Sequence, residues 1–129
     1  MTHHVNTLTA AIIGSAIEVH RALGPGLLES AYRLLLAREL FLRRIPAKTH
    51  WPLPLEYKGL KLNKVYQPDL VVADTVVVET KCVDALAPIH EAQLLTYLRV
   101  GGWTVGLLIN FNVIVLKNGI RRKVLHFDE

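Results

Sequence analysis

One short stretch, residues 67–81, constrains this chain more than any other: Gln-Pro-Asp-Leu-Val-Val-Ala-Asp-Thr-Val-Val-Val-Glu-Thr-Lys. Its two apolar runs flank an Asp-Thr pair, which predicts two buried, Val-rich strands joined by a tight turn. Asp69, Glu79 and Lys81 stand at the outer ends of these strands. Isolated charges are costly to bury. The three side chains therefore either pair with one another or hold something else.

The length of the turn decides whether these charges meet. Successive side chains of a strand alternate between faces, so Glu79 and Lys81 share a face. With a two-residue loop, Asp69 would pair with Thr80 and point away from Glu79. With a three-residue loop at 73–75, Asp69 lies directly opposite Glu79. We therefore predict an odd-length loop or a bulge, because only that parity brings the three groups together.

Helices and strands alternate on both sides of this hairpin. Apolar residues at helical spacing predict helices, and Val-, Ile- and Leu-rich runs bounded by turn residues predict strands. The predicted helices are residues 6–23, 27–44 and 89–100; the predicted strands are 50–57, a bent or bulged strand from about 60 to 73 with 69–73 as its last part, 76–81, 103–110 and 120–126. Residues 111–117 fit either a strand or an irregular segment. This order indicates an α/β domain whose sheet is covered by helices on at least one face.

Composition narrows the class of protein. A length of 129 residues predicts a single domain over residues 1–129, and 51% hydrophobic residues exclude a disordered chain. No apolar run reaches the roughly 20 residues that span a bilayer, so no membrane contact is expected. The single cysteine, Cys82, excludes an internal disulfide and fits a reducing cytoplasm.

Charge and aromatic content bear on the partner. A net charge of +4 and a pI near 9.4 are compatible with a polyanionic partner. Aromatic residues make up only 7%, which argues against a stacking platform for single-stranded nucleic acid. The chain has no recognition insert. A nucleic-acid enzyme of this size would recognise the backbone and the shape of the nucleic acid. It would depend on a homodimer or on another protein for targeting.

Three motifs give the chain a family resemblance. Pro68-Asp69, followed by Glu79-Thr80-Lys81, resembles the core motif of the PD-(D/E)XK nuclease superfamily. Upstream, residues 26–32 (Gly-Leu-Leu-Glu-Ser-Ala-Tyr) resemble the signature of one branch, the GxxExxY proteins; downstream, residues 90–98 are similar to that branch's third helix. The resemblance covers nearly the whole chain. It implies an α/β fold with a restriction-endonuclease-like core, in which a mixed β-sheet is flanked by helices.

The resemblance also implies a chemistry, namely a divalent-metal-dependent nuclease that hydrolyses phosphodiester bonds in DNA. Mg²⁺ or Mn²⁺ would be held by Asp69, Glu79 and the carbonyl of Thr80, with Glu29 as a further carboxylate. Hard divalent cations take such oxygen ligands.

Two polar side chains would complete the reaction site. Lys81 would stabilise negative charge on the phosphate or activate the attacking water, and its high ordinary pKa favours the first role. Gln93 would touch that water or a phosphate oxygen.

Several of these residues admit a plainer interpretation. Tyr32 and Tyr97 either bind phosphate or fill the core. Lys58 and Lys61 either form a phosphate-contacting edge or lie at a solvated hairpin tip. An acidic residue such as Glu29 is favoured in the first turn of a helix in any protein, and Arg33 is spaced to pair with it on the surface.

Two rival functions remain open at this stage. The chain could be a nucleic-acid-binding module that kept the nuclease scaffold without efficient turnover. Alternatively, it could be a structural or assembly protein whose charged cluster is an internal ion-pair network. The first rival would bind DNA independently of metal, with an affinity that falls steeply with salt.

Overall fold

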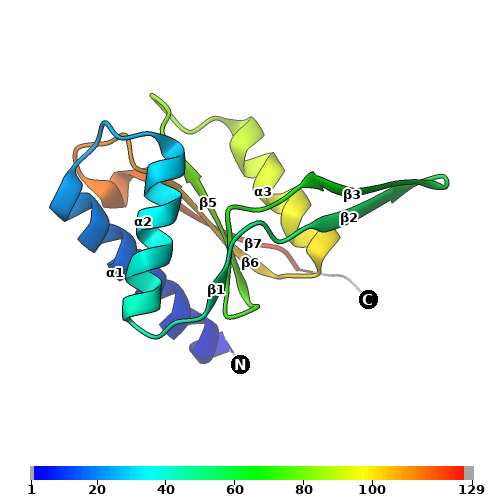
Figure 1. The fold of residues 1–129 in the computed structure, drawn as a ribbon, viewed down its shortest axis with the longest axis horizontal. Helices are drawn as coiled ribbons and strands as arrows, with labels where there is room; N and C mark the ends of the chain where they lie inside the picture. The colour runs from blue at the N-terminus through cyan, green and yellow to red at the C-terminus, as the bar shows by residue number, and fades with distance from the viewer. Residues whose placement is uncertain (1, 127–129) are drawn as a thin grey trace.

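The computed structural model describes residues 2–126, with side chains from residue 4 onward. The elements follow one another in the order α1 (Thr2–Leu23), α2 (Glu29–Leu42), β1 (Ala47–Lys48), β2 (Leu53–Tyr57), β3 (Leu60–Tyr66), β4 (Leu70–Val72), β5 (Val76–Lys81), α3 (Pro88–Gly101), β6 (Val105–Asn110), the short 3₁₀ helix η1 (Leu116–Gly119) and β7 (Ile120–Val124). Figure 1 shows a central sheet with helices on both sides.

The central sheet has five strands in the order β1-β4-β5-β6-β7. The β5–β6 pair is parallel, and its neighbours β4 and β7 run antiparallel to it. Helix α3 makes the crossover between the parallel strands, as such a connection requires. This mixed sheet flanked by helices confirms the predicted α/β, restriction-endonuclease-like fold class.

The two faces of the sheet have separate cores. Val76 and Val78 of β5 lie in a cluster with residues of α1 and α2, whereas Val77 lies in a cluster with residues of α3. Because side chains alternate along a strand, Glu79 and Lys81 continue the row of Val77 on the α3 face. The helix that packs on this face therefore borders the predicted site.

The turn between β4 and β5 confirms the predicted parity. Val72 pairs with Val76 and Leu70 with Val78, so residues 73–75 form a three-residue loop. Ala73 and Asp74 both take positive φ, and the Thr75 N–H donates to the Val72 carbonyl at 2.9 Å. The Asp74 carboxylate also accepts from the Trp103 indole at 3.3 Å, which holds the loop in place.

The predicted strand from about 60 to 73 is wrong in one respect, because it is two strands in two sheets. β3 ends at Tyr66, and β4 begins at Leu70 in the central sheet. Pro68 lies between them and has no N–H with which to continue a ladder. The two-residue strand β1 was not predicted. Residues 111–117 are irregular except at their end, where η1 begins.

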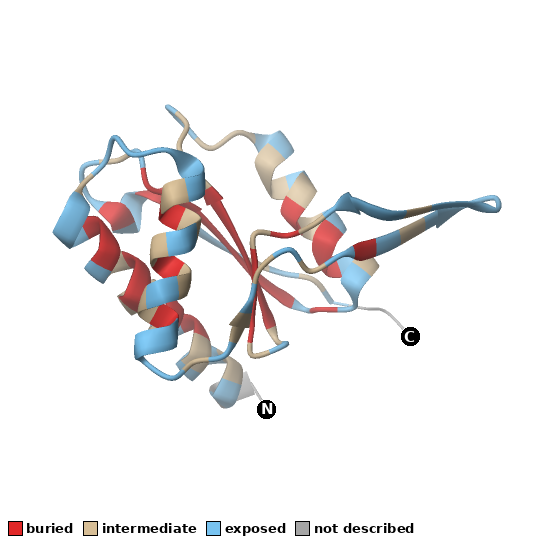
Figure 2. Cartoon of the chain, in the orientation of Figure 1, coloured by how far each residue is buried: buried red, intermediate tan, exposed pale blue. Residues whose placement is uncertain are grey.

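β2 and β3 form a two-stranded arm that projects from the sheet (Figure 1). Pro52 and Pro54 suit an edge position, because proline cannot donate to a ladder. Within the described residues β2 pairs only with β3. Most of the arm is exposed toward its tip, while its base packs against α3 (Figure 2). No helix within residues 2–126 has the length and apolarity needed to cross a membrane.

Candidate active site

Asp69 and Glu79 face each other across the β4–β5 hairpin. The register that pairs Leu70 with Val78 places them opposite one another, one step beyond the end of β4. The Asp69 N–H donates to Glu79 Oε2 at 2.6 Å. The Asp69 carboxylate in turn accepts at Oδ2 from the Thr80 N–H at 2.8 Å and from the Thr80 hydroxyl at 2.9 Å. These bonds fix both carboxyl groups and leave Asp69 Oδ1 and Glu79 Oε1 for a ligand.

The electrostatics of this pair are unfavourable for two anions. Glu79 is only 4% exposed. Burial raises the pKa of Glu79 to about 8, and the nearby carboxylates of Asp69 and Glu29 add to the rise, while the Asp69 N–H and Lys81 oppose it. At neutral pH the metal-free site therefore keeps a proton on Glu79, and a bound cation would displace it.

The carbonyl of Thr80 lacks its usual donor. The Phe111 N–H donates to the Lys81 carbonyl, so odd-numbered residues of β5 bond to β6 and even-numbered residues turn toward β4. Continuing the β4–β5 register places Pro68 across from Thr80. Proline has no N–H, so the ladder cannot supply a donor to this carbonyl. The oxygen is thus available as a ligand beside the two carboxylates.

Lys81 lies beside the acids without being neutralised by them. Its ammonium lowers the pKa of Glu79, and the side chain is half-buried. Among the ion pairs of the described residues, none involves Lys81. The expected alternative, in which Lys81 forms a structural ion pair with Asp69 or Glu79, is not realised.

Glu29 does not join the carboxylate pair as predicted. It is exposed at the first residue of α2, and it influences the site through its charge, which raises the pKa of both Glu79 and Cys82. Within the described residues no group of three or more His, Cys, Asp or Glu side chains is placed to hold a metal ion. The expected set of three carboxylates is therefore a pair with a third acid nearby.

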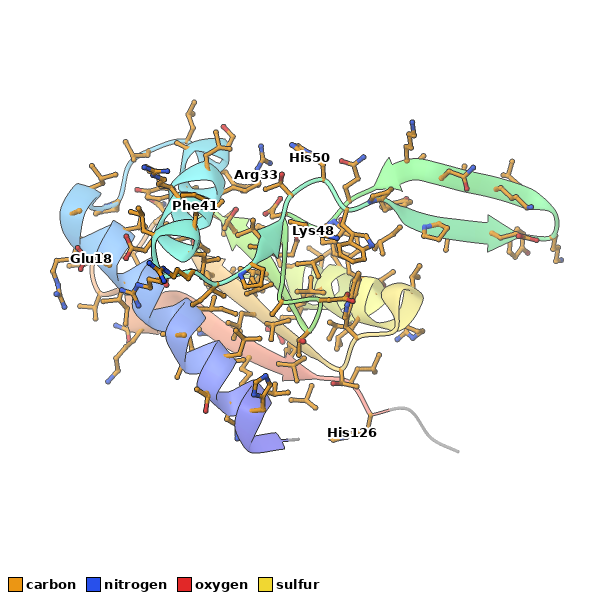
Figure 3. The ribbon with its side chains drawn as sticks, turned by 60° about the horizontal axis from the view of Figure 1, so that its bottom comes forward. Glu18, Arg33, Phe41, Lys48, His50 and His126 are labelled. Atoms are coloured by element: carbon orange, nitrogen blue, oxygen red, sulfur yellow. The ribbon has the colours of Figure 1, made fainter. Side chains whose placement is uncertain are left out.

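Arg33 is a site residue that the sequence did not reveal. Its guanidinium lies 3.8 Å from Asp69 Oδ1, and the two side chains are 26% and 16% exposed. Among the described residues, the buried Arg33 Nε finds no hydrogen-bond partner. β1 ends opposite Val71, so it does not cover the end of β4 that is next to Asp69. Arg33 reaches that end from α2 (Figure 3). The predicted surface pair of Arg33 with Glu29 is replaced by this contact.

Tyr97 and Gln93 come together on α3, on the same face of the sheet as the acids. Gln93 Nε2 donates to the Tyr97 hydroxyl at 3.1 Å, and Tyr97 is 5% exposed. Burial, followed by the charges of Glu79 and Asp69, raises the pKa of Tyr97 to about 12. The Tyr97 phenol is therefore close to the carboxylates and stays protonated. Gln93 is half-buried, as a residue that contacts a ligand should be.

Tyr32 lies in the core, which was the plainer of its two interpretations. It is fully buried and stacks on Phe111 with ring centroids 4.4 Å apart. Its hydroxyl donates to the Gly24 carbonyl and accepts from the Leu27 N–H, which ties the α1–α2 loop to α2. No part of the ring is left for a phosphate.

Lys58 and Lys61 lie at the tip of the β2–β3 arm and are not brought together with the acids. Both are exposed, and the Lys58 ammonium sits 5.2 Å from the centre of the Tyr57 ring. Lys61 pairs in register with Glu56. Both lysines therefore lie at a solvated hairpin tip, which was the plainer of the two interpretations.

The donors fit a hard divalent cation. Two carboxylates with one free oxygen each, and a carbonyl without a donor, are the oxygen ligands that Mg²⁺ or Mn²⁺ prefers, and Mg²⁺ is commonly held by one or two carboxylates with water completing the shell. Burial, together with the charge of Asp69, keeps Glu79 protonated, which is the condition that a cation relieves.

The model of one protein family matches residues 6–123, and it is described as the PD-(D/E)XK nuclease superfamily. The chain belongs to the PD-(D/E)XK nuclease superfamily. A comparison with curated proteins gives no significant match. Among solved structures, the crystal structure of SSO0001 is similar, with a TM-score of 0.57 and 20% identity over 76% of this chain. That likeness shows the fold alone. The chain spans 50% of the length of SSO0001.

Membership in this superfamily accounts for the arrangement of β4 and β5. The superfamily motif is written Pro-Asp, then Asp or Glu, any residue and Lys, which here is Pro68-Asp69 and Glu79-Thr80-Lys81. Each motif residue has a structural consequence in this chain: Pro68 ends the ladder, Asp69 and Glu79 face each other, and Lys81 follows on the face of Glu79. The scaffold is that of a nuclease.

Proposed function

We propose that this protein is a divalent-metal-dependent nuclease that hydrolyses phosphodiester bonds, with DNA as its substrate. The observation that carries the proposal is the hairpin pair itself: Asp69 and Glu79 face each other, and the Asp69 N–H donates to Glu79 Oε2 at 2.6 Å. The Lys81 ammonium lies beside them without an ion pair among the described residues. The motif at residues 26–32 further supports placing the chain in the GxxExxY branch.

Asp69, Glu79 and the Thr80 carbonyl would hold the cation, Mg²⁺ or Mn²⁺. When bound, the cation supplies charge neutralisation and a water of lowered pKa. Glu29 would add a negative charge at the edge of this site, where it already raises the pKa of Glu79.

The cationic side chains would act on the phosphate. Lys81 would hold the charge that develops on a phosphate oxygen, because an unpaired ammonium beside the acids is free to change partners. Arg33 would bind a second phosphate oxygen, since its contact with Asp69 is at 3.8 Å, too long for a hydrogen bond, and its planar donors suit phosphate. Gln93 would orient the attacking water.

A nuclease assay with Mg²⁺ or Mn²⁺ tests this function. The wild-type protein should cut DNA, and Glu79→Ala and Lys81→Ala should each lower the rate by roughly two orders of magnitude or more. Equal activity in all three preparations would assign the cleavage to a contaminant or to another site.

The second candidate is a binding module on the same scaffold. It is favoured by one observation: the described residues do not assemble a third metal-ligating carboxylate, and a neutral Glu79 weakens metal affinity at neutral pH. Such a protein would bind DNA equally well with and without metal, and Glu79→Ala would leave that affinity unchanged.

A further inference from the structure

A small apolar cavity lies between the base of the β2–β3 arm and α3. Its volume is about 270 Å³. Its walls are the aliphatic side chains of Leu53, Leu55 and Val100, together with Tyr66, Tyr97 and Gln93. That volume is just under the roughly 300 Å³ at which pockets for drug-sized ligands begin. It suits a single planar ring system with part of a sugar, and it is too small for a stacked base pair.

This cavity lies on the α3 face of the sheet, the same face as Glu79. Tyr97 and Gln93 line the cavity, and the same Tyr97 phenol feels the charges of Glu79 and Asp69. The hydrogen bond from Gln93 to Tyr97, at 3.1 Å, therefore lies where the two sites join. A group bound in the cavity would therefore lie near whatever occupies the acid pair.

The walls have the chemistry of a nucleobase pocket. Tyr66, the last residue of β3, is 42% exposed, so its ring is accessible for stacking. Leu53 is fully buried and forms the apolar floor. Gln93 uses one N–H on Tyr97, which leaves its carbonyl oxygen and its second N–H for the polar edge of a base. A stacking face, an apolar floor and one amide are what a flipped or unpaired base requires.

We propose that this cavity receives one unstacked nucleobase adjacent to the scissile phosphate, so that the enzyme acts on single-stranded or frayed DNA in preference to continuous duplex. The inference deepens the proposed nuclease function and rests on it. It departs from the expectation from composition: few aromatic residues are present, but two tyrosines, Tyr66 and Tyr97, line this one cavity.

The test uses the full chain with EDTA, so that no cutting occurs, and a single-stranded oligonucleotide that carries 2-aminopurine at one position. Stacking on a tyrosine quenches this base. Quenching and affinity are measured for the wild type, Tyr66→Ala, Tyr66→Phe and Tyr57→Ala. Tyr57 is the matched control because it is an exposed tyrosine on the same arm that does not line the cavity. Mn²⁺ binding by each variant reports whether the acid site is intact.

The wild type, Tyr66→Phe and Tyr57→Ala should quench the probe, and Tyr66→Ala should lose the quenching and bind roughly tenfold more weakly. With metal added, Tyr66→Ala should lower the cleavage of single strands while Mn²⁺ binding is unchanged. The proposal is overturned if Tyr66→Ala and Tyr57→Ala behave alike, or if the wild type cuts blunt duplex as fast as single strands. Quenching without cleavage in any metal would support the pocket and reject the nuclease function; cleavage without quenching would do the reverse.

Discussion

Arg33 of α2 and Asp69 at the start of β4 lie 3.8 Å apart, which joins a helix from one face of the sheet to an acid that belongs to the other. The contact is an ion pair without hydrogen-bond geometry, and Arg33 Nε is buried without a partner. In the metal-free protein the guanidinium thus partly fills the place of a cation beside Asp69. Removal of the Arg33 charge should therefore have opposite effects on metal affinity and on substrate affinity.

Replacing Arg33 with Ala should tighten Mn²⁺ binding and weaken DNA binding. The affinity for Mn²⁺ should rise because a positive charge is removed next to a metal ligand, and the affinity for DNA should fall because a phosphate contact is lost. Each affinity should change by roughly tenfold or less. Isothermal titration of both ligands measures this. Arg38→Ala is the matched control, because Arg38 is exposed on the same helix and stacks on Phe41. Loss of both affinities in Arg33→Ala would point to a purely structural role.

The pH dependence of stability should follow Glu79. In the folded, metal-free protein its pKa is about 8, whereas its ordinary value is 4.5. Between these values the folded state binds more protons than the unfolded state, so the free energy of unfolding falls as pH rises from about 4.5 to 8. Urea unfolding in EDTA across this range measures the slope.

Glu79→Gln should flatten that slope, because an amide accepts the Asp69 N–H without carrying a charge. The variant should be more stable than the wild type at pH values near 8, by roughly 3–5 °C in Tm. Saturating Mn²⁺ should stabilise the wild type most at high pH, where no proton has to leave Glu79. A wild-type slope that matches the variant's would mean that Glu79 is ionised in the folded protein.

Lys81→Ala should separate chemistry from metal binding. The ammonium is expected to act on the phosphate, so kcat should fall by roughly 100-fold while Mn²⁺ affinity stays the same or improves. Lys58→Ala, at the exposed tip of the arm, is the control and should keep full kcat. Single-turnover cleavage at saturating metal measures the difference. An unchanged kcat in Lys81→Ala would leave this residue without a role in the reaction.

Asp69→Asn should weaken both the fold and the metal site. Asp69 Oδ2 accepts two bonds from Thr80, and an amide placed there must turn a nitrogen toward Arg33 or toward Thr80. A loss of about 1–2 kcal/mol in the free energy of unfolding is expected. Thermal unfolding with and without Mn²⁺ should show a lower Tm in both conditions and a smaller metal-induced rise. A full metal-induced rise would exclude Asp69 as a ligand.

Local rules were sufficient to predict the core of this site. Alternation along β5 and the three-residue loop place Asp69, Glu79 and Lys81 on one face, and both follow from the sequence alone. Pro68 also indicates a strand break in the sequence, because a residue without an N–H ends the hydrogen-bond ladder. The continuous strand to 73 was predicted against that signal, and the structure divides it.

Contacts between elements distant in sequence were not predictable in this way. Helix α2 carries apolar residues around much of its circumference, so its pattern does not show which face is buried. In the sequence, Arg33 could therefore not be distinguished from a solvent-facing charge. Its contact with Asp69 depends on how far β1 extends along β4, and a two-residue strand leaves little trace in a sequence. The placement of Tyr66 and Tyr97 in the wall of one cavity likewise depends on how the arm lies against α3.

The most direct test is a crystal of the protein soaked in Mn²⁺ and measured at a wavelength where manganese scatters anomalously. We predict a peak between Asp69 Oδ1 and Glu79 Oε1, within ligand distance of the Thr80 carbonyl, with Arg33 moved away from Asp69. A fully soaked crystal in which this position is empty, or in which Arg33 still occupies it, would contradict the assignment of the hairpin pair as a metal site.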